Sequence, residues 1–249
     1  MFPEIVSFGP ITIHSYGFVI AVGILSSLYL MTIVSERTGF PPPDKVFDLV
    51  FVVVFAGFVG ARLFYVIQEW HWYRGHPLEM FQIWKGGLTY YGGMMTSFAA
   101  FSVYVKLVRL PFLASADFVI PYIALTHAFG RLGCFLNGCC YGNVCHLPWA
   151  VKFPALPYPV HPTQIYEAVF NLILFGFLVW FYARRRFSGQ ITSVYLIAYP
   201  VGRFFLEFLR GDQQPHLFSL TLQQILSLTF MAVGLILYGI LRHRSAQDR

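Results

Sequence analysis

Three arginines lie within or at the edges of long apolar segments of this 249-residue chain: Arg62, Arg131 and Arg203. An arginine at the centre of a bilayer costs at least about 2.5 kcal/mol on insertion scales, so three of them require a reason. Each follows a glycine directly or after one further residue, which allows a ligand to approach closely. A guanidinium group is a permanently charged planar fork that suits phosphate, and membrane lipids carry phosphate. The pattern indicates a pocket for a lipid phosphate.

Buried ion pairs are the alternative explanation for these charges. Arg203 and Glu207 are four positions apart, so they share one face of a helix and can pair. Arg131 has Asp117 and Glu167 as possible partners. An anion or lipid transporter that uses the same arginines is a further alternative. Broken helices in repeated halves would favour the transporter, but the sequence contains no convincing repeat.

Other polar residues stand where apolar segments begin. The stretch GGLTYYGG surrounds Tyr91 with glycines, which indicates either close helix packing or a cavity wall with a tyrosine hydroxyl. The stretch HSYGF places Tyr16 at the start of the first segment, where a tyrosine is also a common interfacial anchor. The stretch HPTQIYE begins another segment, and its His161, Gln164 and Glu167 could line a polar mouth.

The four cysteines follow the spacing C-x4-C-C-x4-C, as Cys134, Cys139, Cys140 and Cys145. Structural zinc sites usually show two well-separated C-x2-4-C pairs, and adjacent cysteines rarely bind one ion. We therefore expect no metal site; a mixed metal or haem site that includes His127, His146 or His161 is the alternative. A disulfide among the last three is plausible if their loop is periplasmic, and Cys134 is expected to be a small apolar residue of the helix packing.

The composition indicates which kind of structure holds these residues in place. Hydrophobic residues make up 57% of the chain, charged residues only 11%, and the mean hydropathy is +0.62. These values indicate an all-α polytopic membrane protein. A span needs about 20 apolar residues. Seven candidate spans cover residues 13–34, 46–68, 87–108, 115–135, 163–183, 190–209 and 221–242. The first apolar segment lacks the features of a cleavable signal peptide, so we expect it to be a retained span.

The basic residues predict the orientation. If the N-terminus lies outside, inner loops hold ten lysines and arginines and outer loops hold four, which favours a cytoplasmic C-terminus. We therefore expect one integral membrane domain, 1–249, with periplasmic loops at about 69–86 and 137–162. The net charge of +6 then describes loops near anionic lipid, and no basic stripe with stacking aromatics suggests nucleic acid.

Taken together, the motifs resemble those of the bacterial prolipoprotein diacylglyceryl transferase family. GRLGCFLNGCCYG is similar to the family signature G-R-x-G-N-F-x-N-G-E-x-x-G. GARLFY, GGLTYYGG, HPTQIYE, RFFLEFLRGD and LQQILSL are similar to its other blocks, in the family's order. The resemblance spans roughly residues 14–228, and the central signature is its most specific part.

The resemblance implies an enzyme of the bacterial cytoplasmic (inner) membrane. The family transfers diacylglycerol from phosphatidylglycerol to the lipobox cysteine in the signal peptide of a preprolipoprotein, forming a thioether and releasing glycerol phosphate. No metal or other cofactor is implied; the partners are these two substrates and the surrounding membrane lipids. Arg131 and Arg203 are implied to face the phosphate, with Glu207 holding Arg203. Residues in or beside the pocket are implied at Tyr16, Asn137, Gly142 and Tyr199. The sequence itself adds Arg62, His161 and Gln164 as candidate substrate-binding residues.

Three positions depart from the family pattern. The family often has asparagine at Cys134, glutamate at Cys139 and, at Tyr91, a histidine that has been considered a base. Tyr91 becomes a candidate catalytic residue by position, but a tyrosine with a pKa near ~10 is a poor base at neutral pH. Either Tyr91 only donates a hydrogen bond, or the thiol loses its proton to water or His127. A divergent relative with another acceptor is the alternative function.

Overall fold

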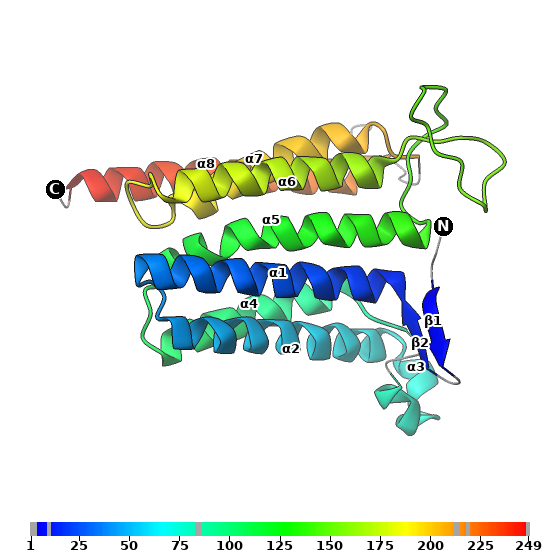
Figure 1. Ribbon diagram of the computed structural model, residues 1–249, viewed down its shortest axis with the longest axis horizontal. Helices are drawn as coiled ribbons and strands as arrows, with labels where there is room; N and C mark the ends of the chain where they lie inside the picture. The colour runs from blue at the N-terminus through cyan, green and yellow to red at the C-terminus, as the bar shows by residue number, and fades with distance from the viewer. Residues whose placement is uncertain (1–3, 9–10, 83–85, 212–214, 218–219, 248–249) are drawn as a thin grey trace. The chain divides into compact units, whose positions relative to one another are not determined.

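The computed structural model describes residues 4–8, 11–82, 86–211, 215–217 and 220–247, and these are mainly helical (Figure 1). Each of the seven predicted spans falls on a helix of 18 or more residues. These helices are α1 (Ser15–Thr38), α2 (Pro43–Gln68), α4 (Tyr90–Leu107), α5 (Phe112–Asn137), α6 (Thr163–Tyr182), α7 (Gln190–Glu207) and α8 (Leu222–Gln247).

Five of the described helices are long and apolar enough to cross a membrane: α1, α2, α5, α6 and α8. The protein is therefore a polytopic, predominantly α-helical membrane protein. Polar residues lower the hydropathy of the other two long helices. Arg203 and Glu207 lie in α7, and α4 contains a lysine, three tyrosines and two glycines. The prediction of seven spans with the N-terminus outside thus stays a prediction.

Short elements occupy the connections. The loop at 69–86 contains α3 (Trp70–Tyr73) and the 3-10 helix η1 (Pro77–Phe81). Two antiparallel hairpins precede long helices: β1 (Glu4–Phe8) pairs with β2 (Ile11–His14), and β3 (Pro215–Leu217) pairs with β4 (Leu220–Thr221). The loop at 137–162 is folded through single backbone bridges, including Val144 with Val160.

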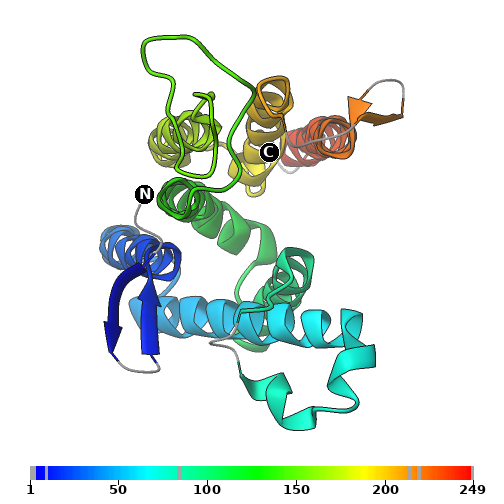
Figure 2. The same cartoon turned by 90° about the vertical axis from the view of Figure 1, so that its right-hand side faces the viewer.

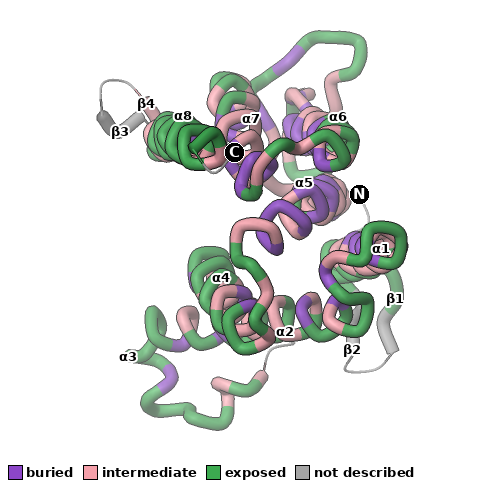
Figure 3. Tube along the Cα trace, turned by 90° about the vertical axis from the view of Figure 1, so that its left-hand side faces the viewer, coloured by how far each residue is buried: buried purple, intermediate pink, exposed green. Residues whose placement is uncertain are grey.

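The chain divides into two compact units, residues 1–29 with 116–249 and residues 30–115. In the first unit, α6, α7 and α8 lie side by side and are seen end-on in Figure 2. Small residues allow close helix packing in membrane proteins, and Ala124 and Ala128 of α5 are fully buried. Figure 3 shows buried positions along α5, which makes this helix suited to position side chains in the interior.

In the second unit, α2 packs against α4. A Cβ added to Gly92 would lie 2.9 Å from the carbonyl oxygen of Gly60, so this contact requires a glycine. Gly86 and Gly87 have φ values of 84° and 80°, which glycine adopts readily. For the glycines of GGLTYYGG, the structure therefore favours close packing and turn geometry, the first of the two explanations from sequence.

Candidate functional site

Arg131 of α5 forms an ion pair with Glu167 of α6. Its Nε lies 3.0 Å from Oε2 of Glu167, and the two side chains are 18% and 4% exposed. Asp117, the other partner considered from sequence, lies elsewhere on α5 and accepts hydrogen bonds from the backbone N–H groups of Gly189 and Thr192, at 2.7 and 2.8 Å. Of the two candidate partners, Arg131 therefore pairs with Glu167 and not with Asp117.

The second oxygen of Glu167 joins two further side chains to this pair. Nε2 of His127 lies 3.4 Å from Oε1, and the Tyr199 hydroxyl donates to the same oxygen at 3.2 Å. The rings of His127 and Tyr199 are also in contact, with centroids 5.3 Å apart. Glu167 thus links α5, α6 and α7 through one buried carboxylate.

A second arginine–carboxylate pair lies within α7. Nη1 of Arg203 lies 2.7 Å from Oε2 of Glu207, as their spacing predicts. Thr221 donates a hydrogen bond to Oε1 of Glu207 at 2.8 Å, and Nε of Arg210 lies 4.0 Å from Oε2. Both Arg131 and Arg203 act electrostatically on His127 and Tyr199, which places the two pairs in one cluster.

In both pairs, the contact between the described side chains is an ion pair without an aligned hydrogen bond. Nε of Arg131 and Nη1 of Arg203 are buried and make no aligned hydrogen bond, despite their short distances to carboxylate oxygens. A buried polar group without a hydrogen bond costs about 1–3 kcal/mol. These donors are therefore held against carboxylates by charge attraction. A planar guanidinium group is also suited to bind an anion such as phosphate.

The turn after α5 is held by the start of α6. Gln164 donates from Nε2 to the carbonyl of Cys139 at 2.6 Å, and Thr163 donates from Oγ1 to the carbonyl of Cys140 at 3.0 Å. The Gln164 side chain thus has a hydrogen-bond partner within the protein, the carbonyl of Cys139. All four cysteines carry free thiols. Hydrogen bonds from the neighbouring thiols of Cys134 and Cys139 lower the pKa of the Cys140 thiol.

Gly142 lies where the loop meets two other segments. Its N–H donates to the carbonyl of His161 at 2.9 Å, and it forms a backbone bridge with Arg210. An added Cβ would collide with the carbonyl oxygen of Leu209 and come within 2.8 Å of Cβ of His161. The ring nitrogen Nδ1 of His161 lies 3.3 Å from the Tyr166 hydroxyl. Both predicted residues thus contribute to the packing of the loop.

Tyr16 and Asn137 lie close to the same turn. The Tyr16 ring packs against Gly133, where an added Cβ would be 3.0 Å from the ring, and Tyr16 interacts electrostatically with Arg131. Asn137 ends α5 with an exposed side chain that interacts with Cys139. The structure therefore brings these two residues to the turn beside Arg131.

Arg62 and Tyr91 belong to the other compact unit. The Arg62 guanidinium group donates to four backbone carbonyls of the loop before α4, those of Glu79, Met80, Gly86 and Gly87, at 2.7–3.0 Å. The structure thus gives Arg62 four partners in the protein backbone. Tyr91 is 48% exposed, and its ring makes an edge contact with Tyr90.

Sequence reasoning missed Glu167 and His127 as members of the site. It considered Glu167 as a partner for Arg131 and as part of a polar mouth, and His127 as a substitute base or a member of a mixed metal site, but it did not join the two residues in one site. The signal that singled out the arginines also applies to Glu167, because an acidic residue within an apolar span needs a partner in the same way.

Between α1 and α5 lies an apolar groove of about 350 Å³. Phe18 and Val22 of α1 and Phe129 and Phe135 of α5 contribute to its lining. The groove and Arg131 share α5, so an apolar chain and an anionic group can be bound along the same helix.

Fold and site together define a multi-pass helical membrane protein with a buried cluster of arginine–glutamate pairs. The chain belongs to the prolipoprotein diacylglyceryl transferase family, whose model matches residues 3–240. It is 35% identical over 237 residues to the phosphatidylglycerol–prolipoprotein diacylglyceryl transferase of Clostridium tetani, covering 93% of this chain and 94% of the relative. The enzyme of the same name from Geobacillus kaustophilus is 36% identical over 244 residues, covering 94% and 90%. That from Nitratidesulfovibrio vulgaris is 35% identical over 259 residues, covering 99% and 95%.

Proposed function

We propose that this protein transfers the diacylglyceryl group of phosphatidylglycerol to the lipobox cysteine of a prolipoprotein, in the bacterial inner membrane. Membership of the family supports the reaction. The structural observation that carries the proposal is the cluster of two arginines, Arg131 and Arg203, each of which is held by a glutamate. Planar guanidinium groups suit a phosphate group.

The reaction exchanges one bond at a glyceryl carbon. The cysteine sulfur forms a C–S bond to the carbon that carries the phosphate, and the C–O bond to that phosphate breaks. The thiol proton passes to a base, and the electron pair leaves with glycerol phosphate, which gains a negative charge. Because charge develops on the leaving phosphate, fixed positive groups beside it lower the barrier.

The two arginines have this role in the proposed mechanism. Arg131 and Arg203 bind the phosphate and stabilise the charge that develops on it. Glu167 and Glu207 hold the guanidinium groups in position, through contacts of 3.0 and 2.7 Å. A lysine could not make the same planar, two-pronged contact with phosphate.

His127 is the proposed proton acceptor. A carboxylate only accepts hydrogen bonds, so contact with Glu167 favours the tautomer that carries the proton on Nε2. The other ring nitrogen, Nδ1, then has a lone pair for the substrate thiol. In serine hydrolases, a carboxylate orients a histidine base in the same way. Tyr91 is proposed to contribute a hydrogen bond and not to act as the base.

The groove between α1 and α5 is proposed to hold an acyl chain of the lipid. Its lining is apolar, and Leu132 and Phe135 belong both to the groove and to the segment that follows Arg131. A lipid with its phosphate at Arg131 could therefore place an acyl chain along the same helix.

The proposal is tested by incubating the purified protein with phosphatidylglycerol and a lipobox peptide. We expect the peptide mass to rise by one diacylglyceryl group and glycerol phosphate to be released in equal amount. A peptide with serine in place of the lipobox cysteine, and the Arg131→Ala variant, are the controls and should give no product. Failure of the wild-type protein to modify any lipobox peptide in phosphatidylglycerol vesicles would argue for another acceptor.

A further inference from the structure

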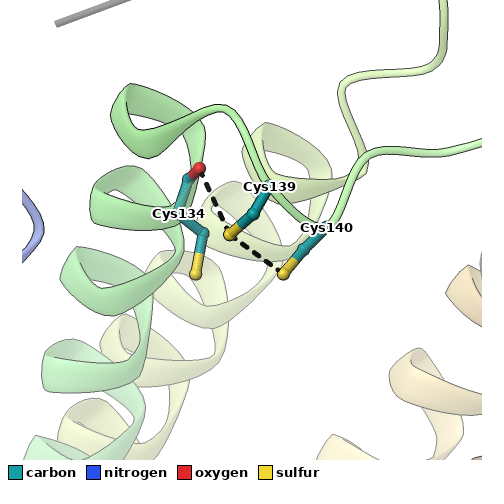
Figure 4. Close-up of side chains that lie close together, drawn as sticks. All are labelled: Cys134, Cys139 and Cys140. Atoms are coloured by element: carbon teal, nitrogen blue, oxygen red, sulfur yellow. Dashed lines mark hydrogen bonds between the residues drawn. The ribbon is translucent and has the colours of Figure 1, made fainter. Parts of the chain in front are cut away.

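Three of the four cysteines converge on one point beside the site. The sulfur atoms of Cys134, Cys139 and Cys140 all lie within 4.8 Å of one another (Figure 4). Cys134 comes from the last turn of α5, and the other two come from the turn that follows it. The sulfurs of Cys139 and Cys140 are 3.1 Å apart. The family function described above gives no role to this thiol cluster.

The backbone of the turn explains how two adjacent cysteines reach the same point. Adjacent side chains in an extended chain point in opposite directions. Here Gly138 has a φ of 77° and Cys140 a φ of 65°, so the chain reverses between α5 and the loop. A positive φ is uncommon for a residue with a side chain, and it is a local strain that the surroundings must hold in place.

The start of α6 supplies that support. The hydrogen bonds from Gln164 and Thr163 end on the carbonyls of Cys139 and Cys140 themselves. Gln164 and Thr163 are 1% and 3% exposed, so neither is free to move away from the turn. The backbone of Cys139 and Cys140 is thus held in place by the start of α6, and their side chains keep the freedom to rotate.

We propose that Cys134, Cys139 and Cys140 form a binding site for one thiophilic divalent ion of the zinc and cadmium class. Thiolates are the ligands that such ions prefer. An ion bound tetrahedrally at a Zn–S distance of ~2.3 Å places its sulfur ligands about 3.8 Å apart. This separation lies between the 3.1 Å that separates the sulfurs of Cys139 and Cys140 and the upper limit of 4.8 Å within the cluster. Small rotations of the side chains bring the sulfur atoms to this separation, and in the proposed site water is the fourth ligand.

The charges around the cluster fit this ligand set. Binding releases the three thiol protons to solvent, and three thiolates with a divalent ion carry a net charge of −1. Arg131 and Arg210 both act electrostatically on the sulfur of Cys140, so positive charge faces the bound group. The inference goes beyond the proposed transfer reaction and does not depend on it.

The test is metal binding by the full-length protein in detergent, reduced with a phosphine and kept free of oxygen. Cadmium is the probe, because thiolate-to-cadmium charge transfer gives an ultraviolet absorption band. We expect one equivalent to saturate the band and zinc to compete. Cys139→Ser should weaken binding by more than the roughly 10–100-fold that loss of an outer-shell partner costs. Cys140→Ser serves as the second variant if the first does not fold.

Cys145→Ser is the matched control. Cys145 lies in the same loop, but its sulfur accepts the N–H of Leu147 at 3.4 Å and takes no part in the cluster. We expect this variant to bind cadmium as the wild type does. The proposal is overturned if the reduced wild type shows no saturable band, if the folded cluster variants bind as tightly as the wild type, or if Cys145→Ser loses binding equally. Because the readout is the bound metal, failure of the transfer reaction would not affect the result.

Discussion

Replacing Glu167 by glutamine tests whether one carboxylate organises the site. Glutamine has nearly the same size and removes only the negative charge that faces Arg131, His127 and Tyr199. At 3.0 Å and an effective dielectric constant of ~20, unit charges attract by about 5.5 kcal/mol. Removing one partner of a buried pair costs about 3–5 kcal/mol after desolvation is included. Since Arg131 keeps 18% exposure, the lower end of about 3 kcal/mol applies.

We expect this loss to appear in kcat. About 3 kcal/mol in the transition state corresponds to roughly a 10²-fold lower rate. The KM for phosphatidylglycerol should stay the same or fall, because removal of a negative charge does not weaken the attraction of Arg131 for phosphate. The assay is steady-state transfer to a lipobox peptide, with lipid concentration varied in mixed micelles.

Asp117→Asn is the matched control for this prediction. Asp117 is a fully buried carboxylate on the same helix as Arg131, and it accepts three hydrogen bonds from Gly189 and Thr192. Its replacement should lower thermal stability and leave kcat nearly unchanged. The reasoning would be refuted if Glu167→Gln kept full kcat, if only its KM rose, or if the Asp117 variant lost kcat equally.

Three other perturbations separate the remaining roles. Arg203→Ala should lower kcat/KM by an amount that corresponds to about 2–5 kcal/mol of lost transition-state binding, and Arg203→Lys should restore little activity. Full transfer activity in the alanine variant would remove Arg203 from the mechanism. Tyr91→Phe should lose one hydrogen bond of ~0.5–1.5 kcal/mol, which lowers the rate roughly two- to twelvefold. The pH–rate profiles of the wild type and the variant measure this loss. A rate loss above about a thousandfold would show that the hydroxyl is essential. Gly142→Ala should lower the unfolding free energy by about 1–3 kcal/mol, because its Cβ would collide with the Leu209 carbonyl; thermal unfolding in detergent measures the loss, and an unchanged Tm would contradict it.

The positions of the helices could be predicted from sequence, because a hydrophobic segment of about 20 residues leaves few alternatives in a membrane protein. The ends were less predictable, since local chemistry determines them. For example, α1 continues to Thr38, four residues beyond the predicted end, and α2 begins at Pro43, where a proline at the first position of a helix needs no N–H partner.

The site was harder to predict because its members are joined through space and not along the chain. The i,i+4 spacing predicted the Arg203–Glu207 pair, and the structure confirms it. No spacing rule joins Arg131 to Glu167, which are 36 positions apart and belong to different helices. Asp117 lies 14 positions before Arg131 on α5, which places it about 21 Å away along the helix axis, so only Glu167 could reach Arg131.

The cysteine cluster could not be predicted from sequence spacing either. Spacing rules for metal sites assume common backbone conformations, and under that assumption adjacent cysteines point apart. Cys140 has a positive φ, so this assumption does not hold here. The hydrogen bonds from Gln164 and Thr163 maintain this backbone conformation. The stretches GRLGCFLNGCCYG and HPTQIYE are therefore two halves of one structural unit. The second half determines the shape of the first, so neither could be interpreted fully without the other.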